Sequence, residues 1–352
     1  MGDAAVLPHA AATAAAGRAY FAALTAAWDE AARRAEVRAH DVSLGGATVR
    51  LRFAGRALEP AYFPALGRPL HGPAGAEPEA TVLLWDSASS GVEAPAQPWR
   101  RADVDGRSRE VDAFASEGLK ALHDPDSELV TMYSIPRRLA VVWVPSDEAV
   151  PWHERTAPLR PLLHWALTRP GRLLVHGGAV AGDRGAVLIV GPSGSGKSTT
   201  VLSCVADGWD YLGDDYVVLA AGTPPVVHAL YATAKLTPDS PVRSRFADDV
   251  VPPRPDADKV VLDLDSRRRL FAPLRAVVVP RVAKLERGSL TSTSPTEALR
   301  ALAPSTILQH PHEAATGLAT MADLVRSVPA YRLDLALDVT DAPRALRPLA
   351  FT

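Results

Sequence analysis

The feature that most constrains the fold of this chain is a glycine-rich segment that follows an apolar run. Residues 186–190 (AVLIV) have the composition of a buried strand, residues 191–198 (GPSGSGKS) match G-x-x-x-x-G-K-[ST], and residues 199–206 read as a helix. In this context, glycines let backbone N–H groups turn toward phosphate oxygens, and the positive helix end faces the same anion. The segment predicts an α/β nucleotide-binding unit; the alternative is a plain Gly/Ser turn.

Each position of the loop has an expected task. Lys197 is expected to reach the β- and γ-phosphates of ATP, and the Ser198 hydroxyl to ligate Mg²⁺. The third glycine of a dinucleotide-binding fingerprint is replaced by Thr199, which argues against that motif. The residues expected to line the nucleotide phosphates are Gly191, Ser193, Gly194, Ser195, Gly196, Lys197, Ser198 and Thr199.

Two adjacent acids and one histidine flank the loop in sequence. Asp214 and Asp215 stand between two strand-like stretches, where acids can hold Mg²⁺ or accept a proton from an attacking hydroxyl. The alternative for Gly213-Asp214-Asp215 is a hairpin turn. His176 lies in the apolar stretch 173–180, and its alternative is a core histidine.

Together, these segments resemble the catalytic domain of the HPr kinase/phosphorylase family over about residues 172–220. The resemblance implies the phosphate-loop fold shared with ATP-dependent phosphoenolpyruvate carboxykinase, transfer of phosphate from ATP to a protein serine, and homo-oligomer formation. It implies Asp214 as general base, Asp215 at Mg²⁺ and His176 near the transferred phosphoryl group. Because adjacent carboxylates titrate together, which acid has which role stays open.

The chain departs from the family in three places. Thr199 stands where the family has an acid, residues 220–260 lack its Arg-Gly-Ile-Gly loop, and the N-terminal half does not resemble it. These departures remove the reason to expect HPr as substrate and leave phosphorolysis open. The nearer analogy is with HPr-kinase-related kinases, some of which phosphorylate ribosomally made peptides.

The first half of the chain predicts a strand-rich α+β domain. We expect a helix over 11–36, a hairpin over 42–53 around Gly45-Gly46, and strands at 81–85, 128–133 and 139–144. A further helix is expected from Thr156 to Leu167. The predicted division is residues 1–157 as a substrate-presenting domain and 158–352 as the phosphate-loop kinase domain.

The acceptor site has weaker candidates. Lys235 can neutralise a phosphate, with a solvated lysine as the alternative, and Arg267 and Arg268 can clamp an anion. The alternative for the two arginines is a solvated turn after a strand at 259–264. His310 and His312 have a metal-like composition, but no cysteine supports a zinc site.

Composition excludes several functional classes. The formal charge of −2 removes the basic footprint of a nucleic-acid binder, and the single cysteine, Cys204, excludes an intramolecular disulfide framework. The chain contains no asparagine, which excludes an Asn-Lys-x-Asp guanine-reading motif and the Asn of a protein-kinase catalytic loop. No uninterrupted apolar run is long enough for a membrane span, so the expected location is the cytoplasm.

These observations predict an ATP- and Mg²⁺-dependent kinase that phosphorylates a hydroxyl, in first place a Ser or Thr of a peptide or protein. A small-molecule hydroxyl is the second acceptor class. The rival function is a nucleotide-binding NTPase or switch without a phosphoryl acceptor.

Overall fold

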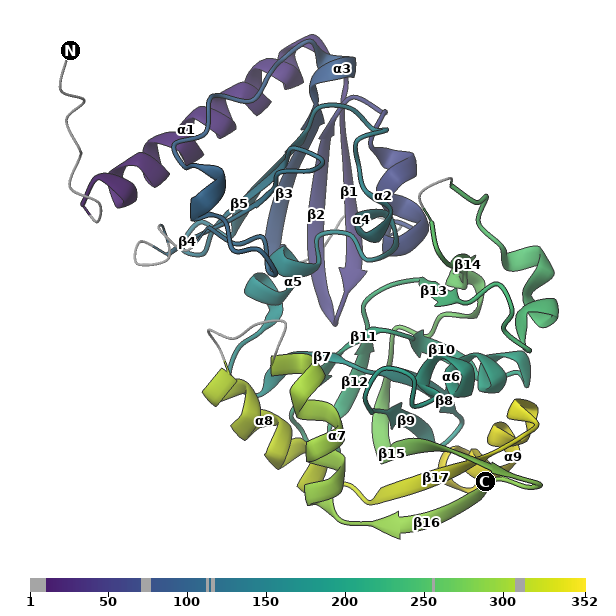
Figure 1. Cartoon of the computed structure of the whole chain (residues 1–352). Coiled ribbons are helices and arrows are strands. Elements are labelled where there is room, and N and C mark those ends of the chain that lie inside the picture. The colour runs from purple at the N-terminus through teal and green to yellow at the C-terminus, as the bar shows by residue number, and fades with distance from the viewer. Residues whose placement is uncertain (1–10, 71–76, 112–113, 115–117, 255–256, 308–313) are drawn as a thin grey trace.

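The protein is a mixed α/β structure in which two main β-sheets lie one above the other (Figure 1). The computed structural model describes residues 11–70, 77–111, 114, 118–254, 257–307 and 314–352. Within these ranges, no helix combines the length and the apolar character needed to cross a membrane.

The first sheet has six strands in the order β1-β2-β3-β6-β5-β4. Strands β2, β3 and β6 run parallel to one another, and the outer pairs are antiparallel. The predicted hairpin and three strands are confirmed, whereas β4 was not predicted because its polar residues (LKALHD) obscure an apolar pattern. The strands are β1 (Val37–Leu44), β2 (Ala47–Ala54), β3 (Ala80–Asp86), β4 (Leu119–Asp124), β5 (Leu129–Ser134) and β6 (Leu139–Val144).

Helix α1 (Ala11–Arg34) covers one face of this sheet and ends two residues before the predicted position. Its buried Leu24 and Trp28 belong to an apolar cluster that includes Trp85 and Met132 of the sheet. Helix α2 (Glu59–Leu66) contributes Tyr62 to the cluster on the opposite face. The remaining short elements are α3 (Ser87–Ser90) and the 3₁₀ turn η1 (Arg101–Asp103).

The second sheet follows the order β10-β8-β9-β15-β12-β11-β7, with β17 and β16 added beside β15. Its parallel core is β9, β15 and β17. The strands are β7 (Arg172–His176), β8 (Gly178–Gly182), β9 (Gly185–Ile189), β10 (Asp210–Gly213), β11 (Tyr216–Ala220), β12 (Val226–Ala229), β15 (Phe271–Leu285), β16 (Ser289–Thr293) and β17 (Ala330–Ala336).

Helices cover both faces of the second sheet. One apolar cluster joins it to α6 (Lys197–Ala206) and α9 (Ala342–Ala350), and another joins it to α7 (Pro295–Ile307) and α8 (Ala314–Arg326). A separate two-stranded ribbon lies nearby. It consists of β13 (Thr233–Leu236) and β14 (Val260–Asp263), with the 3₁₀ segments η3 (Arg243–Asp249), η4 (Asp265–Arg267) and η6 (Val339–Asp341) elsewhere in this half.

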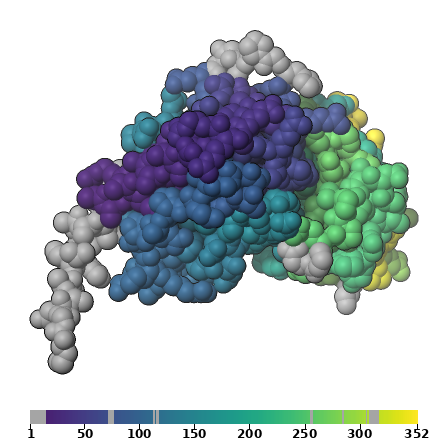
Figure 2. Space-filling view, turned by 90° about the horizontal axis from the view of Figure 1, so that it is seen from above, coloured from purple at the N-terminus to yellow at the C-terminus, as the bar shows by residue number. Residues whose placement is uncertain are grey.

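The tip of the β1–β2 hairpin packs onto the second sheet. Gly45 has a φ of +57°, and a Cβ there would lie 2.6 Å from Val218 Cγ2, so only glycine fits this close approach. Its N–H donates to the Ala229 carbonyl at 2.7 Å, and its carbonyl accepts from Arg172 at 2.6 Å. One apolar cluster runs from Val42 to Tyr231 and crosses the predicted division at 157/158. Figure 2 shows the two halves in direct contact.

The single helix expected from Thr156 to Leu167 is wrong. The chain forms α4 (Trp152–Thr156) and α5 (Arg160–Leu167), because Leu159 adopts a left-handed φ of +58° between two prolines at 158 and 161. Because of this break, α5 begins at Arg160, whose side chain contacts Tyr216. Tyr216 directly follows the two adjacent acids Asp214 and Asp215, which we call the acid pair.

Candidate functional site

The predicted loop follows β9 and leads directly into α6, which begins at Lys197 rather than at the predicted residue 199. Gly194 and Gly196 have φ values of +78° and +100°, a region that glycine occupies without steric cost. At Gly196, an added Cβ would also lie 2.5 Å from Leu335 Cδ1. The chain therefore turns at residues 191–196 in a conformation that depends on its glycines.

Lys197 lies across this loop. Its Nζ donates to the carbonyl oxygens of Gly191 at 2.8 Å and Pro192 at 3.0 Å. The residue is only 8% exposed, and burial lowers its pKa, while Asp215 and Asp214 act in the opposite direction. A positive charge is thus held at the mouth of the loop. The Ser195 hydroxyl is buried there without a hydrogen-bond partner among the described residues, and Thr199 lies in the first turn of α6.

The acid pair lies where the chain passes from one half of the second sheet to the other. Strand β10 pairs with β8, whereas β11 pairs with β7 and β12. The Gly177 N–H donates to the Asp215 carbonyl at 3.0 Å and fixes the crossing point. The hairpin-turn alternative is therefore wrong, since the strands on either side of Asp214 and Asp215 have different partners.

Asp214 is the buried member of the pair, with 2% exposure. Its Oδ2 accepts from the Lys235 N–H at 3.3 Å, and its Oδ1 is buried without a hydrogen-bond partner among the described residues. Burial and repulsion from Asp215 raise the pKa of Asp214, while the Ser198 side chain beside it acts to lower that pKa. The Asp214 carboxyl therefore lies on the side of the acid pair that faces Ser198 and the glycine-rich loop.

Asp215 is the more accessible member, and it forms an ion pair with Lys235. The Lys235 Nζ lies 2.6 Å from Asp215 Oδ2, and the two side chains are 20% and 27% exposed. Burial acts to raise the pKa of Asp215, but the charge and hydrogen bond of Lys235 lower it below its ordinary value. The alternative of a solvated Lys235 is wrong, because the side chain is committed to the acid pair.

His176 ends β7 opposite Tyr216 of β11. The two rings stack with centroids 5.3 Å apart and planes 28° apart. Burial lowers the pKa of His176, and so do Lys197 and Lys235, while Asp215 raises it. The histidine is therefore not an isolated core residue, because these charges are near enough to affect its titration.

Arg267 and Arg268 are held by other partners. Arg267 pairs with Asp249 at 2.8 Å, and Arg268 pairs with Asp265 at 2.8 Å and donates to the Leu66 carbonyl at 3.2 Å. With a side chain 6% exposed, Arg268 does not lie in a solvated turn. In the described part of the chain, no hydrogen bond or ion pair connects either arginine to the loop or the acids. His310 and His312 lie outside the described residues.

A polar cavity of about 370 Å³ lies next to residues that contact Asp215, although neither acid is part of its lining. Lys235, which pairs with Asp215, and Tyr216 line it, and so does Arg109 of the first half. Arg160 also lines it and donates to the Tyr216 hydroxyl at 3.1 Å. Sequence reasoning named Lys235 but missed Arg109, Arg160 and Tyr216. The one available signal was Arg160, a charge within an otherwise apolar helical stretch.

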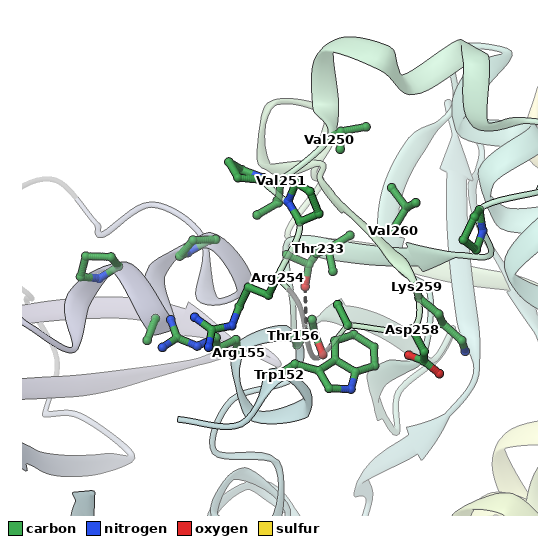
Figure 3. A pocket seen from close by; sticks show the side chains of 18 of the residues that line it. Trp152, Arg155, Thr156, Thr233, Val250, Val251, Arg254, Asp258, Lys259 and Val260 are labelled. Carbon is green, nitrogen blue, oxygen red and sulfur yellow. Dashed lines mark hydrogen bonds between the residues drawn. The ribbon is translucent and has the colours of Figure 1, made fainter. Parts of the chain in front are cut away.

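A second, apolar cavity of about 460 Å³ lies between the ribbon β13–β14 and helices α2 and α4. Figure 3 shows Trp152, Val251 and Val260 around it, with Lys259 at its edge. The Nζ of Lys235 lies 5.7 Å from the centroid of the Trp152 ring. Lys235 and its neighbour Trp152 therefore separate the two cavities.

The loop and acids are chemically suited to a nucleotide phosphate with Mg²⁺. Lys197 offers a cation, Ser198 a hydroxyl oxygen, and Asp214 a buried carboxylate oxygen that lacks a partner. The described residues contain no group of three or more His, Cys, Asp or Glu arranged for a metal ion. Mg²⁺ does not require such a cage, because it binds through one or two protein oxygens together with substrate phosphates and water.

Comparison with known proteins adds little. No protein-family model and no curated protein matches the chain. Among solved structures, the chain is similar to the Hpr(Ser) kinase/phosphatase from Coxiella burnetii, with 11% sequence identity and a TM-score of 0.26. The alignment covers 50% of this chain and 92% of that chain. A likeness this weak, at the level of the fold, supports no statement about activity.

Proposed function

We propose that the chain is an ATP- and Mg²⁺-dependent kinase that transfers the γ-phosphoryl group to the hydroxyl of a Ser or Thr in a peptide or protein. The observation that carries the proposal is that Lys197, Ser198 and Asp214 lie together at the phosphate loop, while Asp215 pairs with Lys235, a residue that lines the polar cavity. The proposal includes a phosphate-loop kinase unit over 158–352 and a substrate-presenting role for residues 1–157.

Bound ATP with Mg²⁺ supplies the phosphoryl group and neutralises part of its charge. Lys197 would bind the β- and γ-phosphate oxygens after leaving the loop carbonyls that hold it now. The acceptor oxygen forms a bond to the γ-phosphorus, the bond from that phosphorus to the β–γ bridging oxygen breaks, and ADP leaves. The hydroxyl proton passes to a carboxylate of the acid pair. Positioning and charge neutralisation account for most of the rate in such reactions.

The surroundings of the two acids support the reverse of the roles expected from the family resemblance. Asp214 is buried beside Ser198, which suits a carboxylate that orients the hydroxyl and water ligands of Mg²⁺. Asp215 is accessible and paired with a residue that lines the polar cavity, which suits the proton acceptor. His176 would stand beside the transferred group as a neutral, polar ring.

Two alternatives keep the same nucleotide site. A small-molecule hydroxyl would need only the polar cavity, whose volume of about 370 Å³ is in the range of small-ligand pockets. An NTPase or switch would transfer the phosphoryl group to water. The built cavity beside Asp215 favours an acceptor other than water.

The test is transfer of label from γ-³²P-ATP to a serine/threonine peptide library and a panel of small hydroxyl compounds. The expected result is a labelled acceptor with the wild type and a loss of about 1,000-fold with Lys197→Ala, whose cation contacts the transferred group. Lys120→Ala on β4 is the matched control and keeps full activity. Label found only in inorganic phosphate would exclude a kinase and favour the NTPase alternative.

A further inference from the structure

The polar cavity has no assigned occupant in the proposed reaction, and its chemistry narrows the acceptor class. We infer that it binds an anionic group of the acceptor, a carboxylate, while the acceptor hydroxyl lies at Asp215. This inference rests on the proposed kinase function and deepens it.

The first argument is the charge of the lining. Four basic side chains face the cavity against two carboxyls, those of Asp124 and Glu154. Burial raises the pKa of Glu154 to about 7, so this carboxyl is about half protonated at neutral pH and largely protonated below it. Burial also lowers the pKa of the lining residue His153, which favours its neutral form. Two of the basic groups already have carboxylate partners outside the lining, Lys235 with Asp215 and Arg109 with the largely exposed Asp126, and an acceptor carboxylate would compete with Asp126 for Arg109.

The second argument is the placement of the basic groups. Arg160 lies beside Tyr216, with its guanidinium 5.5 Å from the Tyr216 ring centroid, and it donates to the Tyr216 hydroxyl. Arg109 lines the cavity from the first half of the chain, with its side chain 36% exposed and paired with Asp126 at 2.9 Å. The cavity therefore offers a carboxylate guanidinium groups from both halves of the chain. Planar guanidinium groups suit carboxylates because they can donate two parallel hydrogen bonds.

The third argument is continuity with the acid pair. Tyr216 follows Asp215 in the chain, and Lys235 both lines the cavity and contacts Asp215 Oδ2. A ligand in the cavity therefore lies near Lys235, which contacts the proposed proton acceptor, and near Arg160, which donates to the Tyr216 hydroxyl. The apolar cavity also has four basic residues in its lining, Arg155, Arg243, Arg254 and Lys259, but that lining includes neither Tyr216 nor Lys235.

A carboxylate near a hydroxyl is found both in a peptide, as an acidic residue or chain end near a serine, and in a small hydroxy acid. The experiment therefore uses γ-³²P-ATP with two sets of paired acceptors. One set is a serine peptide library with an Asp, a Glu or a free carboxyl end near the serine, beside the same peptides with Asn, Gln or an amide end. The other is L-serine and glycerate beside L-serinamide and glycerol.

We expect the carboxylate-bearing member of a pair to have a kcat/KM at least about tenfold higher, because charge-assisted hydrogen bonds to guanidinium are lost in the neutral member. Arg160→Gln and Arg109→Gln should raise the KM for this acceptor about tenfold and leave the KM for ATP unchanged. Arg33→Gln, on an exposed arginine of α1, is the matched control and should change neither. If Arg160→Gln does not fold, Arg109→Gln on the outer wall carries the test.

The possible outcomes distinguish failure of this inference from failure of the proposed function. Preference in the peptide set or in the hydroxy-acid set supports the inference and identifies the source of the carboxylate. Labelled acceptors without a preference for a carboxylate, or variants with an unchanged acceptor KM, overturn the inference and leave the kinase function standing. ATP turnover with no labelled acceptor in either set overturns the proposed function itself, and the inference with it.

Discussion

The two sides of the acid pair are built in opposite ways. The loop side, with Lys197, Ser198 and Asp214, comes from one continuous stretch of strand, loop, helix and strand. The cavity side, with Arg109, Arg160, Tyr216 and Lys235, brings together four stretches that are far apart in the chain. The proposed nucleotide site is thus built from one local stretch, whereas the proposed acceptor site depends on how the whole molecule packs.

The two sides also differ in burial and charge. Asp214 is 2% exposed, whereas the Asp215 side chain is 27% exposed and paired with Lys235. Adjacent residues in the chain thus face different environments, because the backbone crosses between two halves of the sheet at this point. We infer that this crossing separates the handling of the nucleotide from the handling of the acceptor. The following predictions test that separation, in order of decreasing effect.

The largest effect is expected for Asp215→Asn on the cavity side. An amide cannot accept the hydroxyl proton, so kcat should fall by about 100-fold or more. The measurement is the steady-state rate of acceptor labelling, with thermal unfolding as a check on folding. Asp210→Asn, an exposed aspartate of β10, is the matched control and should retain its activity. A kcat within twofold of the wild type would remove Asp215 from the reaction.

The pH dependence of the unfolding free energy tests whether Glu154, in the wall of the polar cavity, is buried. Its pKa rises from an ordinary value of 4.5 to about 7 in the folded protein, because burial penalises the charged form. The folded state therefore holds the proton more tightly, and this stabilisation is full below about pH 4.5 and is lost as the pH rises through 7. Relative to Glu154→Gln, the wild type should lose about 2 kcal/mol of unfolding free energy between pH 5 and pH 8.

The measurement is urea denaturation of both proteins at the two pH values. If the difference in unfolding free energy between the wild type and Glu154→Gln does not change with pH, Glu154 is solvated. The cavity would then be more open than the structure has it.

Substitution of the loop glycines tests how much the stability of the protein depends on the loop conformation. Both Gly194→Ala and Gly196→Ala place a Cβ at positive φ, which costs about 1 kcal/mol. Gly196→Ala adds a clash with Leu335, whereas Gly194 has open space around it, so the loss for Gly196→Ala should be about 1 kcal/mol larger. Chemical denaturation measures both. Equal losses would show that Leu335 moves aside.

The smallest effect is expected for His176→Gln. Loss of the ring stacked on Tyr216 should lower kcat about tenfold through misplacement of the acceptor side, with little change in the KM for ATP. Acceptor-labelling kinetics at saturating ATP measure this change. An unchanged kcat with reduced thermal stability would assign His176 a purely structural role.

Sequence alone could predict the loop side because its signals are local. The strand before Gly191, the glycines and Lys197 occupy consecutive positions, and β9 and α6 form where their composition indicates. The cavity side could not be predicted, because it depends on the left-handed turn at Leu159. The same limit applies to Lys235, which was predicted as a residue that can neutralise a phosphate, although nothing in the sequence indicated that it pairs with Asp215.

The sheets show a similar limit. Alternating residues predicted the β1–β2 hairpin, but the packing of its tip on Val218 and Ala229 depends on contacts between distant segments. Likewise, the strands beside Asp214 and Asp215 were expected, but their separate partners follow only from the order of the whole sheet.

The most direct test of the separation is calorimetric binding of a non-hydrolysable ATP analogue with Mg²⁺ to Asp214→Asn and Asp215→Asn. We predict that Asp214→Asn weakens Mg²⁺-dependent binding about tenfold, because the carboxylate beside Ser198 is lost. Asp215→Asn should bind the analogue with a Kd within about twofold of the wild type while failing to label an acceptor. Weakened analogue binding by Asp215→Asn, with unchanged binding by Asp214→Asn, would contradict the assignment of the two acids to opposite sides.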